Sequence, residues 1–371
     1  MPASWHDRVR RFAHAAQSEF IGVRSLRDPP VSYTHLSSVP AVGANARAHA
    51  AGLHGFAVNA IPQRFMPTKF LPMRGRHATA AELRGIYVST FAGTDLYGFP
   101  KNNSGNGPST CTVSPTGSVN NFGVDNAGNL MIPNTFFTSS IETHEIDVYG
   151  PGMCGPFLGE IIDPYGQPSD ASAVSATTGK IAVGNIVDTS GPGSVSVCTL
   201  TSGTCSTNLT NPAIEEIGGV GMAANGDCWA DGISSDDVTS LVYFAGCSGA
   251  GVVATGFTNG FYGGVDLDNK GNLVTTSLFA PSFELPSTVN VYSGCNPACT
   301  LISSSPLTGE SIFGHVGRRN LRYVTTNIES SDVEVYTYRP SGLTFLYSFT
   351  GGLPCATDEC EAAAYSPSSQ K

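Results

Sequence analysis

Six acidic or amide residues recur at one place in a repeated sequence unit, and their oxygen atoms could bind a hard cation. One precedes each predicted strand of small and apolar residues: Asn121, Asp170, Glu216, Asn259, Glu310 and Glu361. Carboxylate and amide oxygens are the ligands that Ca²⁺ and Mg²⁺ take in proteins. If the repeats stand around an axis, these side chains form a ring at its mouth, so the sequence predicts a divalent-cation site, with Ca²⁺ as the expected ion. The alternative is a set of solvated loop residues in an acidic protein that holds no cofactor.

His315 is the residue that the sequence places best for a catalytic role as general base. It lies in Gly314-His-Val, on a predicted innermost strand, and imidazole titrates close to neutral pH. The alternative is a hydrogen-bonded residue that lines the axis. No His-Glu-x-x-His, phosphate loop or dinucleotide fingerprint is present, and Gly246-Cys-Ser-Gly lacks the spacing of a nucleophile elbow.

Two acid-containing segments imitate part of a calcium-binding loop. In Asp266-Leu-Asp-Asn-Lys-Gly271, Lys270 stands where the fifth-position ligand should be, and no Glu ends the loop. Asp125-Asn-Ala-Gly128 is a shorter version. Asp and Asn side chains in tight reversals accept N–H groups of their own turn, so the sequence predicts turns here.

A β-patterned core that recurs along the chain indicates how these residues are positioned. The copies are Leu96–Phe99, Ile146–Tyr149, Val195–Cys198, Ser240–Tyr243, Val289–Tyr292 and Val333–Tyr336. Their spacing of 44 to 50 residues, with strands throughout, is typical of a β-propeller with one repeat per blade.

The first repeat lacks its innermost strand, because it begins with the second strand at Ile86–Ser89. The missing strand is expected from the C-terminal segment Glu361–Tyr365, which has the same small residues. The sequence therefore predicts an all-β fold, a six-bladed β-propeller over residues 86–367 closed by the C-terminal strand. Residues 1–85 are expected to form an irregular, partly disordered N-terminal extension. A solenoid would need end caps and would not explain the split repeat.

The sequence resembles the six-bladed propellers of the NHL and SMP-30 type. The resemblance rests on Gly264-Val-Asp followed by Gly271-Asn-Leu and Val289-Asn-Val-Tyr, and covers about residues 70–367. The opening Gly85-Ile-Tyr-Val-Ser-Thr is similar to that of exported bacterial propellers of this group. In the lactonases of this type a Glu, two Asn and an Asp hold a divalent metal at the channel. The resemblance therefore implies a fold and leaves several functions open.

Charge is distributed unevenly along the chain. Residues 1–85 hold 11 basic and 4 acidic residues, a balance of +7, and the remainder holds 8 basic and 25 acidic residues, a balance of −17. An acidic surface repels phosphate backbones, so nucleic acid is not expected as a partner. No apolar run is long enough for a transmembrane helix.

All ten cysteines lie after residue 110, and close pairs among them favour disulfides in an oxidising compartment. Cys198–Cys205 and Cys295–Cys299 are the predicted pairs, since each spans one hairpin, and Cys355 and Cys360 are also close. The expected location is extracellular or periplasmic, although no signal-peptide core follows the basic start.

Two functional readings follow, and the sequence leaves both open. The favoured one is a secreted or periplasmic binding or scaffold module without chemistry of its own, expected to be a monomer. Its partner would be a small molecule, a glycan or a protein. The alternative is a metal-dependent hydrolase of the lactonase type that uses the channel-mouth acids and His315. A third reading, a lyase of the streptogramin-opening type, needs a His pair near the axis that the sequence does not offer.

Overall fold

The structure is a computed structural model of the 371-residue chain. It describes residues 85–90, 94–115, 117, 119, 121–134, 144–175, 179–188, 191–234, 238–258, 263–277, 286–317, 322–328, 330–353 and 360–366. The chain divides into two units, Met1–Met66 and Pro67–Lys371, and every described residue belongs to the second. The predicted N-terminal extension lies outside the described residues except for Gly85, which begins the first strand.

The described residues form strands and no helix, as the sequence predicts. The first half of the strands comprises β1 (Gly85–Thr90), β2 (Leu96–Pro100), β3 (Cys111–Val113), β4 (Gly123–Val124), β5 (Leu130–Pro133), β6 (Glu145–Tyr149), β7 (Phe157–Ile162), β8 (Gly166–Ala173), β9 (Ile181–Asp188), β10 (Gly191–Thr199), β11 (Thr204–Leu209) and β12 (Glu216–Met222). The second half comprises β13 (Cys228–Ile233), β14 (Thr239–Phe244), β15 (Val252–Val253), β16 (Val265–Leu267), β17 (Leu273–Ser277), β18 (Thr288–Ser293), β19 (Thr300–Pro306), β20 (Phe313–Gly317), β21 (Arg322–Asn327), β22 (Asp332–Arg339), β23 (Gly342–Phe349) and β24 (Cys360–Ser366).

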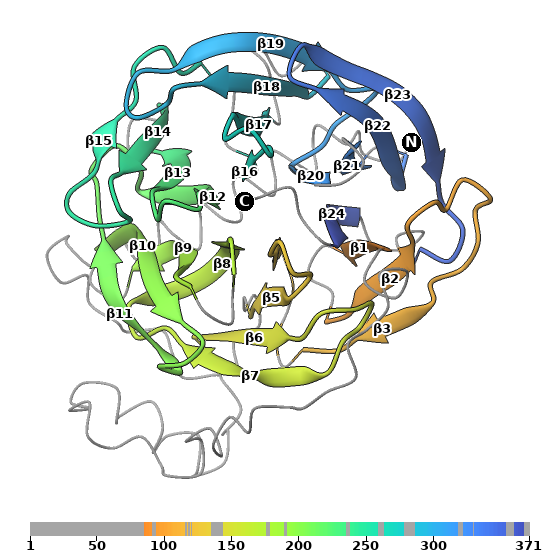
Figure 1. Cartoon of the computed structure of the whole chain (residues 1–371), viewed down its shortest axis with the longest axis horizontal. Helices are drawn as coiled ribbons and strands as arrows, with labels where there is room; N and C mark the ends of the chain where they lie inside the picture. The colour runs from red at the N-terminus through yellow and green to blue at the C-terminus, as the bar shows by residue number, and fades with distance from the viewer. Residues whose placement is uncertain are drawn as a thin grey trace, which may run out of the picture. The chain divides into compact units, whose positions relative to one another are not determined.

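These strands make four hydrogen-bonded sheets arranged around an axis (Figure 1). Two sheets have four strands, in the orders β12-β13-β14-β15 and β16-β17-β18-β19. Two have eight, in the orders β23-β22-β21-β20-β24-β1-β2-β3 and β4-β5-β6-β7-β11-β10-β9-β8. Each copy of the recurring β-patterned core lies on a strand, namely β2, β6, β10, β14, β18 or β22, which confirms that the repeat marks equivalent strands.

The C-terminal strand β24 lies between two strands that are far away in the sequence. It pairs antiparallel with β1, with Ile86 opposite Tyr365 and Val88 opposite Ala363, and parallel with β20. In Figure 1 the blue strand β24 accordingly stands beside the orange strand β1. All seven residues of β24 are buried.

The turns that follow the inner strands are built as the sequence predicts. The Asp125 carboxylate accepts the N–H groups of Ala127 and Asn129, and the Asp268 carboxylate accepts those of Lys270 and Asn272. The glycines of these turns, Gly128 and Gly271, have φ of 93° and 80°, a region in which an L side chain is strained. The second oxygen of each carboxylate accepts the side-chain amide of Asn129 or Asn272, and that of Asp268 also accepts the Tyr338 hydroxyl.

The hydrophobic core consists of several clusters of buried residues, and some of them join neighbouring sheets. One cluster joins Val195 and Val197 of β10 to Val220 of β12 and Val242 of β14. Another joins Val289 and Val291 of β18 to Val316 of β20 and Tyr336 of β22. Alternate side chains of each strand thus bury against the next sheet, and the free energy of this burial holds the ring together.

Inner strands approach so closely that glycine is required at some positions. A Cβ atom on Gly123 of β4 would lie 2.1 Å from the carbonyl oxygen of Ala171 on β8. We expect Gly123→Ala to lower the free energy of unfolding by about 2–3 kcal/mol, because neighbouring backbones must separate. Urea unfolding of the two proteins measures this. Gly105→Ala is the control, since a Cβ atom there meets no atom within 4 Å, and equal destabilisation by both variants would contradict the close-approach argument.

Four disulfides are present among the described residues. Cys198–Cys205 and Cys295–Cys299 confirm the two predicted pairs. The others, Cys111–Cys154 and Cys228–Cys247, join residues 43 and 19 positions apart. Cys355 lies outside the described residues. These bridges indicate an oxidising environment.

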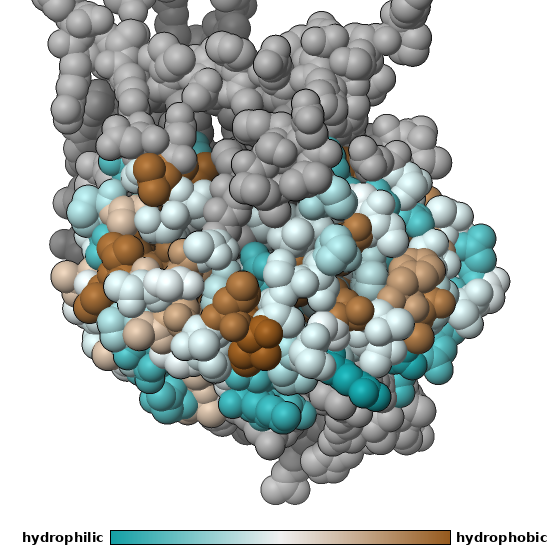
Figure 2. Space-filling model, turned by 90° about the horizontal axis from the view of Figure 1, so that it is seen from above, coloured by the Kyte–Doolittle hydropathy of each residue, from teal (hydrophilic) through white to brown (hydrophobic). Residues whose placement is uncertain are grey.

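Large apolar side chains are exposed mainly on the outer strands: Phe157, Val252, Val253, Leu301, Ile302, Phe345 and Leu346, with Val238 just before β14. Figure 2 shows the apolar residues of one side as separate brown patches among pale and teal ones. The structure contains no helix, within its described part, that is long and apolar enough to cross a membrane.

Candidate functional site

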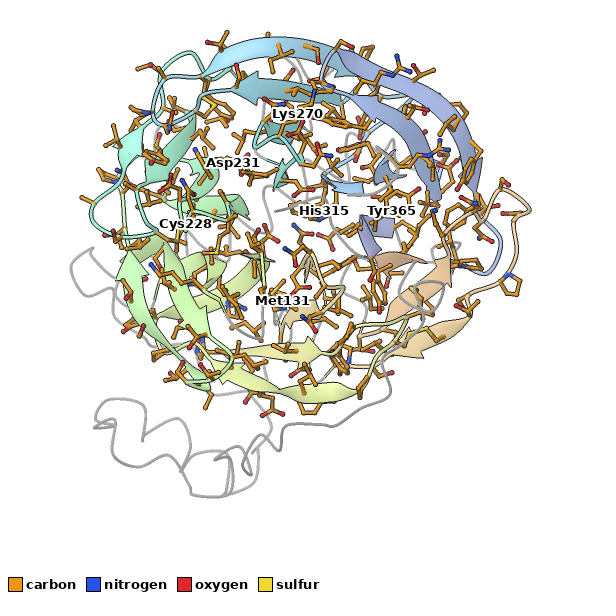
Figure 3. The ribbon with its side chains drawn as sticks, viewed as in Figure 1. Met131, Cys228, Asp231, Lys270, His315 and Tyr365 are labelled. Carbon is orange, nitrogen blue, oxygen red and sulfur yellow. A yellow bond between two sulfur atoms is a disulfide. The ribbon has the colours of Figure 1, made fainter. Side chains whose placement is uncertain are left out.

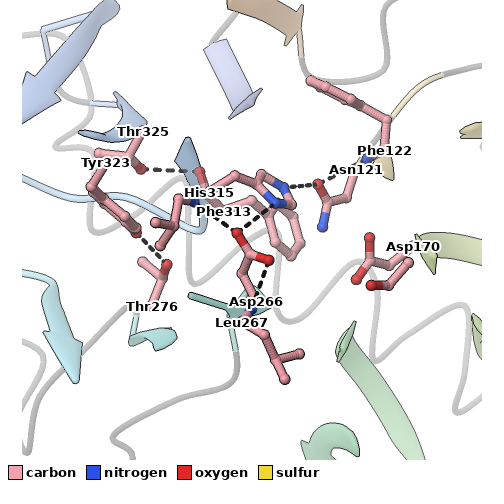
Figure 4. A network of polar contacts seen from close by, with 12 residues as sticks. Asn121, Phe122, Asp170, Asp266, Leu267, Thr276, Phe313, His315, Tyr323 and Thr325 are labelled. Carbon is pink, nitrogen blue, oxygen red and sulfur yellow. Dashed lines mark hydrogen bonds and ion pairs between the residues drawn. The ribbon is translucent and has the colours of Figure 1, made fainter. Parts of the chain in front are cut away.

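A cluster of polar side chains lies at the centre of the ring, around His315 of β20 (Figure 3). The imidazole Nδ1 lies 3.7 Å from Asp266 Oδ2 on the neighbouring inner strand β16. Its Nε2 lies 3.5 Å from Asn121 Oδ1, and the ring stacks on Phe122 with centroids 6.3 Å apart. Only 11% of the His315 side chain is exposed, against 1% for Asp266. The structure therefore brings together two residues of the predicted sites, His315 and Asn121, across the axis (Figure 4).

The acids of this cluster are hydrogen-bonded to the main chain of neighbouring inner strands. Asp266 Oδ2 accepts the Val316 N–H at 2.7 Å, and its Oδ1 accepts the Leu267 N–H. In the same way, Asp170 Oδ2 on β8 accepts the Val220 N–H of β12 at 2.7 Å, and its Oδ1 accepts the Ala171 N–H. Each carboxyl group thus joins its own inner strand to the next one around the ring.

Burial raises the pKa of two carboxyl groups near the axis, those of Asp170 and Asp231. Removal from water raises the pKa of Asp170 to about 7, although hydrogen bonds from Val220 and Ala171 and the nearby His315 lower it in part. Burial also raises the pKa of Asp231 on β13 well above its ordinary value, against a hydrogen bond from the Gly263 N–H, and the charge of Asp170 adds to the rise. A carboxyl group with a pKa near neutrality can hold or release a proton under physiological conditions.

Two buried polar atoms near this cluster have no hydrogen-bond partner within the described part of the chain. They are Nδ2 of Asn121, whose Oδ1 accepts the Phe122 N–H, and Oδ1 of Asp231. Both residues are fully buried. Together with His315 and Asp170, these groups could hold water, position a small polar molecule or transfer a proton.

A second set of hydrogen bonds holds the strand that carries His315. The hydroxyl groups of Tyr323 on β21 and Thr276 on β17 lie 2.6 Å apart, and Thr325 Oγ1 donates to the Phe313 carbonyl oxygen at 3.0 Å. All four residues are buried, and burial raises the pKa of Tyr323, which keeps its hydroxyl protonated. The first contact joins β21 to β17 and the second joins β21 to β20, so β20 is held through β21 (Figure 4).

The remaining residues of the predicted metal set lie at varied places. Asp170 lies inside β8 and Glu361 inside β24, which corrects the prediction that they precede the inner strands, because these two strands begin earlier. Glu216 begins β12 and is half-buried, and Glu310 is buried ahead of β20. Asn259 lies outside the described residues.

The predicted metal role of this set stays a prediction. The oxygen atoms of Asn121 and Asp170 already accept main-chain N–H groups, so a cation would compete with hydrogen bonds that hold the inner strands. Across the described ranges, one trio of His, Cys, Asp or Glu has its ligand atoms within 4.8 Å of one another, Asp163 with Cys198 and Cys205. Those two cysteines form a disulfide.

Asp266 is the residue of the central cluster that sequence reasoning assigned only to a turn. The signal that would have found it is the repeated Val-Thr-Thr of β17 and β21, at Val274 and Val324. Val274 pairs with Asp266 and Val324 pairs with His315. Asp266 and His315 therefore occupy equivalent positions on neighbouring inner strands. If the two strands are instead aligned on Gly264 and Gly314, Asp266 and His315 differ in position by one residue.

Comparisons with known proteins bear on the fold alone. No protein-family model matches the chain, and no curated protein matches it. A chain in the crystal structure of a nidogen/laminin complex is 10% identical, with a TM-score of 0.56, and the match covers 78% of this chain and all of that one. A functionally unknown protein from Desulfotomaculum acetoxidans is 15% identical over 73% of this chain and 80% of that chain, with a TM-score of 0.47. The WD40 β-propeller domain of Doa1 is 11% identical over 74% and 81%, also with a TM-score of 0.47. The arrangement of the sheets around an axis is that of a β-propeller fold (Figure 1).

Proposed function

We propose that the strands form six blades of four strands each and that β24 closes the ring. Support comes from the two eight-stranded sheets, each of which divides at a parallel contact within an otherwise antiparallel sheet. One contact joins β20 to β24, with Phe313 opposite Ala362, and the other joins β7 to β11, with Ile162 opposite Thr204. Dividing the sheets there leaves β24-β1-β2-β3 as one blade, built from both ends of the domain over residues 86–367.

The propeller acts as a secreted or periplasmic binding module without catalysis of its own. The observation that carries this proposal is the use of the axial carboxyl groups. In both Asp170 and Asp266, each carboxylate oxygen accepts a main-chain N–H group. One of these N–H groups belongs to the next inner strand. Side chains used in this way stabilise the ring, and ligand binding falls to other surfaces of the blades.

The same proposal includes a location and a class of partner. Four disulfides favour an extracellular or periplasmic compartment. The acidic balance of the propeller disfavours nucleic acid, which leaves a small molecule, a glycan or a protein as the partner of a monomer.

A second candidate function is a metal-dependent hydrolase of the lactonase type at the central channel. It is favoured by His315, which lies between Asp266 and Asn121. Asn121 Nδ2, which has no hydrogen-bond partner among the described residues, adds a donor for a substrate oxygen. In this reading His315 is the general base, and Asn121 and Asp170 belong to a cation site with Glu216, Asn259, Glu310 and Glu361.

Metal analysis and an activity panel separate the two candidates. We expect purified protein to contain substoichiometric Ca²⁺ and other divalent metals, and to hydrolyse none of a set of lactones and esters, with or without added Ca²⁺. His315→Gln, which keeps a polar group at the axis, should behave like the parent protein. Turnover that a chelator abolishes, and that His315→Gln lowers without loss of the thermal transition, would establish the hydrolase instead.

A further inference from the structure

A pocket of about 370 Å³ lies between turns of two sheets, and none of the residues of the central cluster lines it. Its walls are the turn between β12 and β13, the turn between β16 and β17, and the loop between β18 and β19. Small-molecule sites in proteins span about 300–1,000 Å³, so this pocket lies at the lower end of that range. It suits a ligand of one or two rings.

The floor of the pocket is apolar and contains one flat aromatic ring. Trp229 of β13 lies there with Leu267 and Leu273, each at most 7% exposed. The Trp229 Nε1–H donates to the Cys295 carbonyl oxygen at 2.6 Å, and Tyr243 packs on the indole with centroids 5.5 Å apart. The polar atom of the indole is thus already bonded and its position is fixed, so it offers the pocket an apolar surface.

The rim of the pocket is polar and carries both signs of charge. Asp227 accepts the Gly246 N–H at 2.7 Å, the Tyr243 hydroxyl at 2.9 Å and the Asn225 amide at 2.7 Å. Burial alone would raise the pKa of Asp227, but these hydrogen bonds outweigh it and lower the pKa, so the carboxylate stays charged. Lys270 and Asn296 lie on the other walls and are exposed.

Lys270 is not needed by the turn that carries it. The corresponding turn between β4 and β5, Asp125-Asn-Ala-Gly128, has Ala127 at the same place and the same hydrogen bonds from its Asp. Within the described ranges, the Lys270 side chain has no ion pair or hydrogen bond. Figure 3 shows Lys270 farther from the axis than His315, in keeping with a site distinct from the central cluster.

An apolar floor with one indole ring, below a rim of amide, carboxylate and ammonium groups, matches the two faces of a sugar ring. A pyranose has an apolar face of C–H groups that packs on an indole, and hydroxyl groups that both donate and accept. An anion would meet Asp227, and a cation would meet Lys270, so a neutral ligand fits this rim best. We propose that the pocket binds a neutral pyranose sugar, either free or as the exposed end of a glycan. This inference rests on the proposed binding function.

Tryptophan fluorescence tests the proposal directly. The chain has two tryptophans, Trp5 and Trp229, so Trp5→Phe leaves Trp229 as the single reporter. Titration of that variant with a panel of neutral monosaccharides and oligosaccharides should give a saturable change for at least one sugar. Stronger binding of oligosaccharides than of their terminal monosaccharide identifies a glycan end, and equal binding identifies the free sugar.

Variants of the rim locate the site. Lys270→Ala, in the Trp5→Phe background, should weaken binding about tenfold, the loss expected for a hydrogen bond from one charged donor. Its thermal unfolding should stay unchanged, because Ala127 occupies the equivalent turn. Lys101→Ala is the control for loss of a positive charge elsewhere and should bind like the parent.

The outcomes distinguish the sugar proposal from the function on which it rests. No saturable change with any sugar, or equal affinity of Lys270→Ala and its parent, overturns the sugar proposal. If isothermal titration then finds a non-sugar small molecule that Lys270→Ala fails to bind, the binding function stands with a different ligand. Chelator-sensitive turnover in the lactone panel would overturn the binding function itself.

Discussion

A chain truncated after Glu359, and so lacking β24, is expected to lose cooperative folding altogether. The strand pairs with both β1 and β20, and none of its residues is more than 5% exposed. Its removal would uncover Ile86 and Val88 of β1 and leave the backbone groups of both neighbouring strands without partners. Domains are stable by only about 5–15 kcal/mol, and losing a fully buried strand of seven residues exceeds that margin.

Circular dichroism and thermal unfolding of the truncated chain measure this loss. Truncation after Ser366 is the control, because it keeps β24 complete. The longer truncation also removes Cys360, which is disulfide-bonded, so a second variant keeps every cysteine. Ala363→Asp places a carboxyl group at a fully buried position opposite Val88 and is expected to cost about 4 kcal/mol or more. A truncated chain that still unfolds cooperatively, within about 5 °C of the parent, would show that β24 does not hold the ring.

The stability of the propeller is expected to fall as the pH rises from about 5 to 8. Asp170 has a pKa of about 7 in the folded chain because it is buried, against an ordinary value of 3.8. A group whose pKa is raised by folding binds its proton more tightly in the folded state. Its contribution is therefore complete below about pH 4 and is lost progressively up to about pH 7. Asp231, whose pKa is also raised, acts in the same direction.

The variant Asp170→Asn separates the contribution of Asp170 to this pH dependence from the contributions of other acids. The variant loses the acceptor for the Val220 N–H, so at pH 5 it should be less stable than the parent by about 1–2 kcal/mol. Asparagine does not titrate, so the variant keeps its free energy of unfolding where the parent loses stability. Between pH 5 and 8, the free energy of unfolding of the variant should therefore rise relative to that of the parent by about 2–3 kcal/mol. Urea unfolding at several pH values measures both proteins, with Glu215→Gln as the control at a half-exposed acid. Parallel profiles for Asp170→Asn and the parent would show that Asp170 does not carry the pH dependence.

Local sequence signals predicted the strands and turns well, because the residues that specify them lie next to one another. The recurring β-patterned core marks equivalent strands, and the turn acids Asp125 and Asp268 accept N–H groups within four residues. The disulfides show the limit of this reasoning. Pairs 7 and 4 residues apart could be predicted from hairpin geometry, whereas Cys111–Cys154 needs a contact between different sheets.

The central cluster depends on register between strands, which the sequence specifies less directly. His315 and Asn121 could be placed near the axis from their position in the repeat. Their contact, and the part played by Asp266, depend on which residue of each inner strand faces the channel. A shift of one residue along a strand turns the other set of side chains towards the channel. Alignment of the inner strands on Gly264 and Gly314 contains such a shift, so it did not reveal Asp266 as the equivalent of His315. The resemblance to NHL and SMP-30 propellers agrees with the β-propeller fold, and beyond the fold it stays a prediction.

The pairing of β1 with β24 has a mechanical consequence. Gly85 and Ser366 lie opposite each other at the same end of this strand pair. Force applied between these two residues would therefore load the interstrand hydrogen bonds one after another, starting at this end of the ladder. It would not load all of them at the same time. The strands β1 and β24 would therefore separate from each other at low force.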